Sequence, residues 1–322
     1  MSLTLGELFA SPDHYLHAFD GDAAVFMPMD RAAYHRSIFL DGRISPAADQ
    51  SMALPVAALA REARAPAPTA WIFHMAHCGS TLLARALDDP SASLVLREPL
   101  ALRQTAINPD ADRLALVLAM IGKRYRADAP TLVKANVPVN FLLPQLADAD
   151  AGAHAILLYL PLRAYLLAIL RSENHRNWLR NVTSQLSPYL GDLSPLADAE
   201  RAAALWLAQV EAFTGALARM PQARTLDAEL FFTDPLAVLK SAARHLGVPV
   251  SDPVLETTVA GPLFNTYSKN PEIAFDNAAR IARSAEVETA IAPELDAAEA
   301  WIARHAAGSS PDAALTKAAL IR

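Results

Sequence analysis

From residue 70 onward, short apolar runs alternate with longer segments in which apolar residues recur at helical spacing. This alternation is typical of parallel βαβ units. The predicted strands are Trp71–His74, Leu94–Leu96, Thr131–Lys134, Ala155–Tyr159 and Ala223–Leu226. The predicted helices cover residues 80–87, 111–124, 139–147, 163–172, 198–218, 234–246 and about 294–307. We therefore expect an α/β fold with a central, mostly parallel sheet and helices on both faces.

The first part of the chain has a different pattern. Residues 1–65 contain helical fragments and a segment, residues 39–44, with a turn at its centre. They end in Arg64-Ala65-Pro66-Ala67-Pro68, which predicts an extended linker because each proline disfavours helix at the residue before it. We expect residues 1–65 to form an N-terminal extension packed on a main domain of residues 66–322.

Residues 71–87 contain the most informative pattern of the sequence. An apolar run gives way to the small-residue turn Ala76-His77-Cys78-Gly79, and an amphipathic helix begins at once with Ser80 and Thr81. In this layout backbone N–H groups converge at a helix N-terminus, whose partial positive charge favours an anion. No lysine stands between Gly79 and Ser80, so the pattern Gly-x-x-x-x-Gly-Lys-Ser/Thr of ATP- and GTP-hydrolysing proteins is absent. The bland alternative is a glycine turn that only joins a strand to a helix.

Composition narrows the class of protein. The chain has 322 residues and a formal net charge of -6, so it lacks the basic excess of a nucleic-acid-binding protein. The single cysteine, Cys78, excludes an intrachain disulfide and fits a reducing compartment. Neither a signal-peptide pattern nor an apolar stretch of about 20 residues is found. The expectation is a soluble cytoplasmic protein that binds neither nucleic acid nor membrane.

Several motifs in order along residues 71–269 resemble the sulfotransferase family. The segment from His77 to Leu83 is similar to the loop that binds the 5′-phosphosulfate, and Val133-Lys134-Ala135-Asn136-Val137-Pro138 resembles the family segment Val-Lys-x-His-x-Pro. The other matching segments are Leu96-Arg97-Glu98-Pro99, residues 223–235, residues 245–249 and Thr266-Tyr267-Ser268-Lys269. The resemblance implies a P-loop-like three-layer fold and the co-substrate 3′-phosphoadenosine-5′-phosphosulfate, without a metal ion.

The resemblance also assigns roles to particular residues. The loop from Ala76 to Leu82 (Ala76, His77, Cys78, Gly79, Ser80, Thr81, Leu82) would hold the 5′-phosphate. His77 replaces the cation of the family loop and would assist the transferring group together with Lys134. The alternatives are that His77 only caps or packs, that Lys134 is a surface lysine, and that Cys78 is a small packing residue.

Glu98 is the predicted general base. It follows a strand that we expect beside the loop strand, where ligands bind in open α/β sheets. Some branches of the family have a catalytic glutamate in this region. The alternative is a solvated carboxylate, or one paired with Arg97 or Arg103. The histidine of cytosolic sulfotransferases is replaced by Asn136, which cannot accept the proton.

The subsite for the 3′-phosphate departs furthest from the family pattern. Of the family's two arginines and serine, Arg163 is retained, whereas Leu160 and Ala168 replace the other two. Arg171-Ser172 follows about two turns later and provides a substitute, with Ser172 as the hydroxyl. Lys269 and Arg280 are secondary candidates for closing over the nucleotide. The alternative is that Arg163 is a surface residue and the subsite is lost.

Taken together, these features predict a sulfotransferase-like enzyme that transfers a sulfuryl group to a hydroxyl or amine. An ATP-dependent phosphotransferase is the first alternative, and the absent loop lysine argues against it. A catalytically silent nucleotide-binding protein is the second, and it is compatible with Asn136, Leu160 and Ala168. The sequence identifies neither the acceptor nor the oligomeric state.

Overall fold

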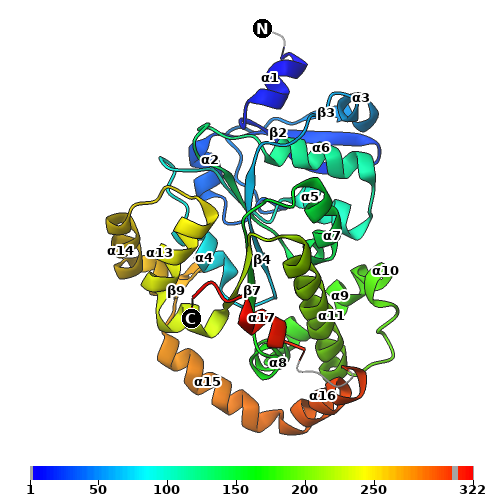
Figure 1. Cartoon of the computed structure of the whole chain (residues 1–322), viewed down its shortest axis with the longest axis vertical. Coiled ribbons are helices and arrows are strands. Elements are labelled where there is room, and N and C mark those ends of the chain that lie inside the picture. The colour runs from blue at the N-terminus through cyan, green and yellow to red at the C-terminus, as the bar shows by residue number, and fades with distance from the viewer. Residues whose placement is uncertain (1–2, 307–310, 322) are drawn as a thin grey trace.

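A computed structural model describes residues 3–306 and 311–321 (Figure 1). Its centre is a five-stranded sheet in the order β5-β6-β4-β7-β8. The strands are β4 (Thr69–His74), β5 (Val95–Arg97), β6 (Thr131–Lys134), β7 (Ala155–Tyr159) and β8 (Ala223–Asp227). Every neighbouring pair in it is parallel, so the predicted α/β class and all five predicted strands are confirmed.

The order of the strands corrects one expectation. β5 lies at the edge of the sheet, and β6 separates it from the loop strand β4. The chain leaves β4 toward that edge, whereas it leaves β7 toward β8 at the opposite edge. The connections therefore diverge at the carboxyl end of β4, which is where open α/β sheets place a ligand.

Helices cover both faces of the sheet, which gives the three layers (Figure 1). One layer, on the left of the figure, contains α4 (Ser80–Ala86), α13 (Pro235–Leu246) and α14 (Asp252–Ala260). The other contains α5 (Leu100–Ile107), α6 (Ala111–Ile121), α7 (Leu143–Ala149) and α11 (Asp198–Arg219). The long helix α11 packs on α7, α8 (Leu162–Leu170), α9 (Glu173–Gln185) and α16 (Ala292–His305). Within the described residues no helix is both long and apolar enough to cross a membrane.

The structure differs from the predicted secondary structure in two segments that border the site. Residues 137–142 form the 3-10 helix η1 (Val137–Leu142) ahead of α7, where one longer helix was predicted. Residues 173–185 form the helix α9, which is not among the helices predicted from the sequence. Its polar residues follow helical periodicity, with only Leu179, Val182 and Thr183 buried.

The N-terminal residues form three strands in addition to the predicted helical fragments. β1 (His14–Asp20), β2 (Ala23–Pro28) and β3 (Met52–Pro55) make an antiparallel sheet. The short helices of this region are α1 (Leu5–Ala10), α2 (Arg31–Arg36) and α3 (Val56–Ala60). Leu40 then donates its backbone N–H to the Arg97 carbonyl at 2.7 Å, which brings residues 39–43 beside the end of β5. The division at residue 65 stays a prediction.

The C-terminal part of the chain covers the end of the molecule at which residues 39–43 lie beside β5. After α12 (Ala228–Thr233), α14 and η2 (Pro262–Phe264), a hairpin of β9 (Thr266–Tyr267) and β10 (Asn270–Ala274) leads into α15 (Asn277–Ala290). α15 runs along the lower edge of the molecule in Figure 1 and has no buried residue. The remaining short helices are α10 (Ser187–Leu190) and α17 (Ala313–Lys317). Beyond α17, Ala319 pairs with Thr225 beside β8.

Candidate functional site

A cavity of about 470 Å³ lies at the carboxyl ends of β4, β5 and β6. Its wall is built from the loop after β4, the ends of the two neighbouring strands, the start of η1, one face of α9 and the hairpin β9–β10. Residues of the N-terminal segment 39–43 complete it. The volume is within the usual range for a small-molecule site, about 300–1,000 Å³.

The loop between β4 and α4 depends on Gly79. Its φ is +81°, in the left-handed region that favours glycine, and it is the N-cap of α4. A Cβ at this position would lie 2.8 Å from Cζ of Phe232, so α12 also packs too closely for any side chain here. The first helical bond runs from the Leu83 N–H to the Gly79 carbonyl at 3.0 Å. The N–H groups of residues 80–82 therefore have no partner within the helix.

All of the predicted loop residues from Ala76 to Leu82 line the cavity. The Thr81 hydroxyl is buried and has no hydrogen-bond partner among the described residues. The same holds for two other polar atoms of the cavity wall, Nε2 of His74 and Oδ1 of Asn136. A buried polar atom without a partner costs about 1–3 kcal/mol, so three such atoms on one wall indicate a ligand that supplies the partners.

The backbone is strained at two points of this cavity. Among the described residues, His77 with a φ of +60° and Glu98 with a φ of +56° are the non-glycine residues with positive φ. Such conformations cost about 1–3 kcal/mol each and cluster at functional sites. Both were predicted to be site residues, and both line the cavity.

The structure brings Glu98 and Lys134 together. The Lys134 ammonium is completely buried and forms an ion pair with Oε1 of Glu98. The Glu98 backbone N–H also donates to the Lys134 carbonyl at 2.7 Å. Burial is the largest single effect and would raise the pKa of Glu98, but the charge and hydrogen bond of Lys134, with smaller contributions from His74 and Lys269, together lower this pKa to about 2. In the ligand-free protein Glu98 is therefore ionised and paired with Lys134, and it is a weak base.

Three alternatives for these residues are wrong. Lys134 is buried and is not a surface lysine. Arg97 is turned away from Glu98 and is also buried; it pairs with Asp88 and donates to backbone carbonyls of residues 34–37. Arg103 donates instead to the amide oxygen of Gln185, on α9, at 2.9 Å.

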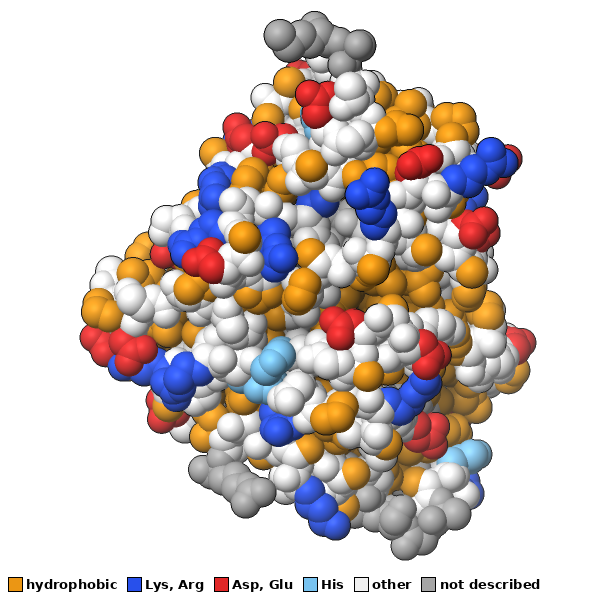
Figure 2. Space-filling view, turned by 45° about the horizontal axis from the view of Figure 1, so that its top comes forward, with side chains coloured by type: hydrophobic (Ala, Val, Ile, Leu, Met, Phe, Trp, Pro, Cys, Tyr) orange, Lys and Arg blue, Asp and Glu red, His pale blue; other side chains and the backbone are white. Residues whose placement is uncertain are grey.

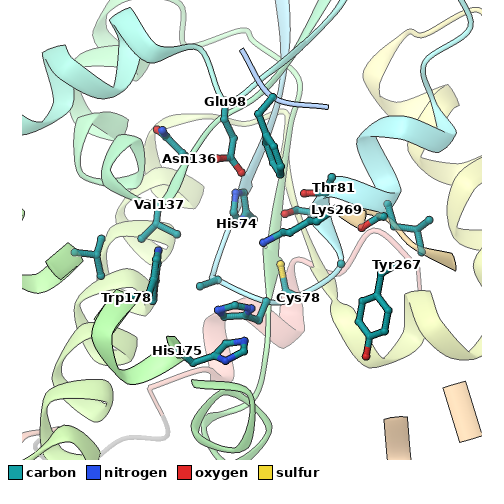
Figure 3. A pocket seen from close by; sticks show the side chains of 18 of the residues that line it. His74, Cys78, Thr81, Glu98, Asn136, Val137, His175, Trp178, Tyr267 and Lys269 are labelled. Atoms are coloured by element: carbon teal, nitrogen blue, oxygen red, sulfur yellow. The ribbon is translucent and has the colours of Figure 1, made fainter. Parts of the chain in front are cut away.

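His77 lies in a cluster of rings. Its ring centroid is 4.3 Å from that of His175 and 5.7 Å from that of Trp178, both on α9 (Figure 3). Burial and the positive charges of Lys269 and Arg171 lower the pKa of His77 well below its ordinary value. His77 is therefore neutral in the ligand-free protein and does not supply the loop cation that the sequence resemblance led us to expect there.

The predicted residues for the 3′-phosphate separate into two groups. Arg163 does not line the cavity; its guanidinium is half exposed and pairs with Glu288 and Glu299 at 2.7 Å each. This corrects the prediction that Arg163 contacts the nucleotide from this cavity. Arg171, the residue that caps the C-terminus of α8, does line it.

Ser172 also lies outside the cavity wall, which corrects its predicted direct role. Its hydroxyl is 2.5 Å from Nδ1 of His175, and Nε2 of His175 accepts from Arg171 at 2.9 Å. Ser172 and Arg171 thus hold His175, which lines the cavity beside His77.

Lys269 and Arg280 both line the cavity, as the secondary predictions required. Lys269 extends from the β9–β10 hairpin toward the loop and forms no hydrogen bond or ion pair with a described residue (Figure 3). Surrounding protein and the charge of Lys134 lower its pKa, as expected for a cation held near others without a counter-ion. Arg280, in contrast, donates two hydrogen bonds to the carboxylate of Glu229, at 2.7 and 2.9 Å.

The charge of the cavity contrasts with that of the chain. Five Lys or Arg residues line it, against two acidic residues, whereas the chain as a whole has a net charge of -6. These residues are Arg43, Arg103, Arg171, Lys269 and Arg280, against Asp41 and Glu98. On the face shown in Figure 2, basic and acidic side chains are interspersed. The positive field is therefore local to the cavity, which suits an anionic ligand.

The sequence analysis missed two contributions to this wall. His74 was assigned only to the loop strand, although a polar residue that ends an apolar run just before such a loop is a signal for a site residue. Residues 39–43 were seen only as a turn; no local signal places Asp41 and Arg43, which pair at 2.5 Å, against the end of β5.

Cys78 is expected to be unreactive in the native protein. Its side chain is fully buried, and its Sγ–H donates to the Met75 carbonyl at 2.9 Å. Burial raises the pKa of the thiol to about 11, so the thiolate is scarce at pH 7. Iodoacetamide at pH 7.5 should modify the urea-unfolded chain at least 100-fold faster than the native one. Comparable rates would show that the loop opens readily.

No protein-family model matches the chain, and no curated protein matches its sequence. Among the solved structures that are similar to it are two sulfotransferases. The sulfotransferase domain from the curacin biosynthetic pathway is 13% identical over 65% of this chain and 84% of that chain, with a TM-score of 0.38. A sulfotransferase from Alicyclobacillus acidocaldarius is 15% identical over 73% of this chain and 98% of that chain, with a TM-score of 0.39. Likenesses at this distance carry no argument about activity.

Proposed function

We propose that the protein is a sulfotransferase-like enzyme that binds 3′-phosphoadenosine-5′-phosphosulfate and transfers its sulfuryl group to a hydroxyl or amine. The observation that carries the proposal is the loop at residues 76–82. It presents three N–H groups without helical partners and the unpartnered Thr81 hydroxyl to a cavity with an excess of positive charge. Donors of this kind bind phosphate and sulfate oxygens.

The reaction places specific demands on these residues. The acceptor's lone pair attacks sulfur, the bond from sulfur to the bridging oxygen breaks, and its electron pair stays on the leaving phosphate. Negative charge therefore grows on the phosphate, where the loop N–H groups and Thr81 would stabilise it. Lys269 provides a cation for the sulfuryl oxygens and has no competing partner among the described residues. Lys134 is fully buried, is paired with Glu98 and does not line the cavity.

Binding measurements test the nucleotide preference. We expect isothermal titration calorimetry to give an affinity for 3′,5′-diphosphoadenosine at least 10-fold higher than for its 3′-dephosphorylated analogue. A charge-assisted contact to a phosphate is worth about 1.5–3 kcal/mol, which is about 10- to 100-fold in affinity. Tighter, magnesium-dependent binding of ATP would instead support a phosphotransferase. Binding without sulfate release from the sulfated nucleotide, under any acceptor tested, would support a silent binding protein.

A pair of arginine variants tests the place of the 3′-phosphate. Arg171→Ala should weaken binding of 3′,5′-diphosphoadenosine about 10-fold, because Arg171 lines the cavity without a carboxylate partner. Arg163→Ala is the matched control, since Arg163 is bound to two glutamates outside the cavity wall. Equal losses in both variants, or a loss only in Arg163→Ala, would contradict this assignment.

A further inference from the structure

His74 is the last residue of β4 and is 5% exposed, and it lines the cavity next to the loop (Figure 3). Its Nδ1 lies 2.7 Å from the Met75 carbonyl oxygen. Because a carbonyl only accepts, Nδ1 carries the hydrogen and Nε2 carries the lone pair. Nε2 is buried and has no hydrogen-bond partner among the described residues.

The position of His74 is fixed from a second direction. The side-chain amide of Asn140, on η1, donates to the His74 carbonyl at 3.0 Å and to the side-chain oxygen of Gln209 at 3.1 Å. Both Asn140 and Gln209 are fully buried. The ring therefore has one tautomer and a held backbone, which is how a general base is oriented.

The titratable groups that face His74 come from four segments. The charged ones are Lys134 on β6, Glu98 after β5 and Lys269 on the hairpin, and the neutral but titratable His77 faces it from the loop. Burial and the charge of Lys134 lower the pKa of His74 to about 3, so the lone pair is free at neutral pH. A bound polyanion would offset Lys134 and Lys269, which raises the pKa of His74 and makes it a stronger base.

Glu98 is less able than His74 to accept a proton during the reaction. Its Oε1 already accepts from Lys134, and its carboxylate is the counter-charge of a fully buried ammonium. Protonating Glu98 during the reaction would leave that ammonium without a partner. Protonating His74 breaks no bond that the protein makes.

We propose that His74 Nε2 accepts the proton of the attacking nucleophile, while Glu98 stays paired with Lys134. This inference rests on the proposed sulfuryl transfer. With water as the nucleophile, its oxygen forms the new bond to sulfur and one of its two protons goes to Nε2. The other proton stays on the hydrogen sulfate that forms and is then lost to solvent. The bond to the bridging oxygen breaks, and 3′,5′-diphosphoadenosine leaves with the electron pair. Sulfate and 3′,5′-diphosphoadenosine are the products, and His74 then releases its proton to solvent.

The test uses this hydrolysis because it needs no knowledge of the natural acceptor. Single-turnover release of sulfate from the sulfated nucleotide is compared in the wild type, His74→Asn and Glu98→Gln. Asparagine keeps a donor for the Met75 carbonyl but lacks Nε2. His74→Asn should slow release at least 100-fold, because general base catalysis contributes about 10²–10⁴-fold. Its affinity for 3′,5′-diphosphoadenosine should stay within threefold of the wild type. His154→Asn, a histidine outside this cavity, should leave the rate unchanged.

A spectroscopic measurement separates a base from a merely structural residue. Imidazole ¹⁵N NMR should show Nε2 of His74 unprotonated at pH 7, and 3′,5′-diphosphoadenosine should shift its titration to higher pH by at least one unit. A hydrolysis rate in His74→Asn within threefold of the wild type, or a proton on Nε2 rather than Nδ1, would overturn the proposal. If the wild type binds no 3′,5′-diphosphoadenosine, the proposed function itself fails. If the wild type binds and cleaves the sulfated nucleotide and His74→Asn cleaves it equally well, only the role of His74 is overturned.

Discussion

Replacing Gly79 by alanine is expected to lower the free energy of unfolding by about 2–4 kcal/mol and to weaken nucleotide binding at least 10-fold. A left-handed conformation costs a non-glycine residue about 1–2 kcal/mol. The new Cβ would also lie 2.8 Å from Phe232, and overpacking of this kind costs about 1–3 kcal/mol. Relief of either strain turns the loop, so the N–H groups of residues 80–82 lose their alignment. Urea unfolding and calorimetry measure the two effects.

Two variants separate these causes. Gly21 also has a positive φ, +51°, but a Cβ there meets nothing within 4 Å. Gly21→Ala should therefore cost only the conformational part and leave nucleotide binding unchanged. In a Phe232→Ala background the clash is absent. Gly79→Ala should therefore lower the free energy of unfolding less in that background than in the wild type, by the amount due to the clash. A loss in Gly79→Ala no greater than in Gly21→Ala would show that α12 moves aside and that the contact does not restrict the loop.

Lys134→Met is expected to lower the free energy of unfolding at pH 7 by about 3–5 kcal/mol. Removing one partner of a buried ion pair leaves the other charge uncompensated, which accounts for a loss of this size. Lys134 is completely buried and Glu98 mostly so, so solvent cannot replace the missing ammonium. Urea unfolding measures the loss. Lys240→Met, which removes a more exposed lysine paired with Asp252 and Glu256, should leave the free energy of unfolding almost unchanged.

The pH dependence of this loss has a defined sign. In the wild type the pKa of Glu98 is lowered from 4.5 to about 2, so its stabilising contribution is present above pH 4.5 and is lost as the pH falls toward 2. In Lys134→Met, burial without the ammonium raises the pKa of Glu98, so protonation at low pH stabilises the folded state. The difference in the free energy of unfolding between the wild type and Lys134→Met should therefore be smaller at pH 4 than at pH 7.

The double variant Lys134→Met/Glu98→Gln completes the thermodynamic cycle. It removes both charges, and it should recover at least half of the loss in Lys134→Met. A deficit in Lys134→Met that is independent of pH would show that packing, rather than the unpaired carboxylate, causes the loss.

Features set by local chemistry could be predicted from the sequence. Apolar runs gave the five strands of the central sheet, because strands buried on both faces have few polar positions. The loop at residues 76–82 was found for a similar reason: a glycine and hydroxyl residues between a strand and a helix have few other uses. The N-terminal strands were missed because their apolar and polar positions alternate only partly, as the burial patterns of β1 and β2 confirm.

Contacts between distant segments could not be predicted. The pairing of Glu98 with Lys134, 36 positions apart, follows from the adjacency of β5 and β6 and not from either motif. The failure of Arg163 has the same origin. The motif placed it by its distance from a strand, but α15 and α16 supply the two glutamates that hold it outside the cavity wall.

The sequence by itself determined the α/β class, the strands of the sheet and the position of the turn between β4 and α4, because each depends on residues close together in the chain. Only the tertiary structure decided which side chains share the cavity and in which protonation state. Those properties depend on burial and on charges contributed by separate elements. His74 illustrates both: its place at the end of β4 is local, but its free Nε2 and lowered pKa result from Met75, Lys134 and the closed wall around them.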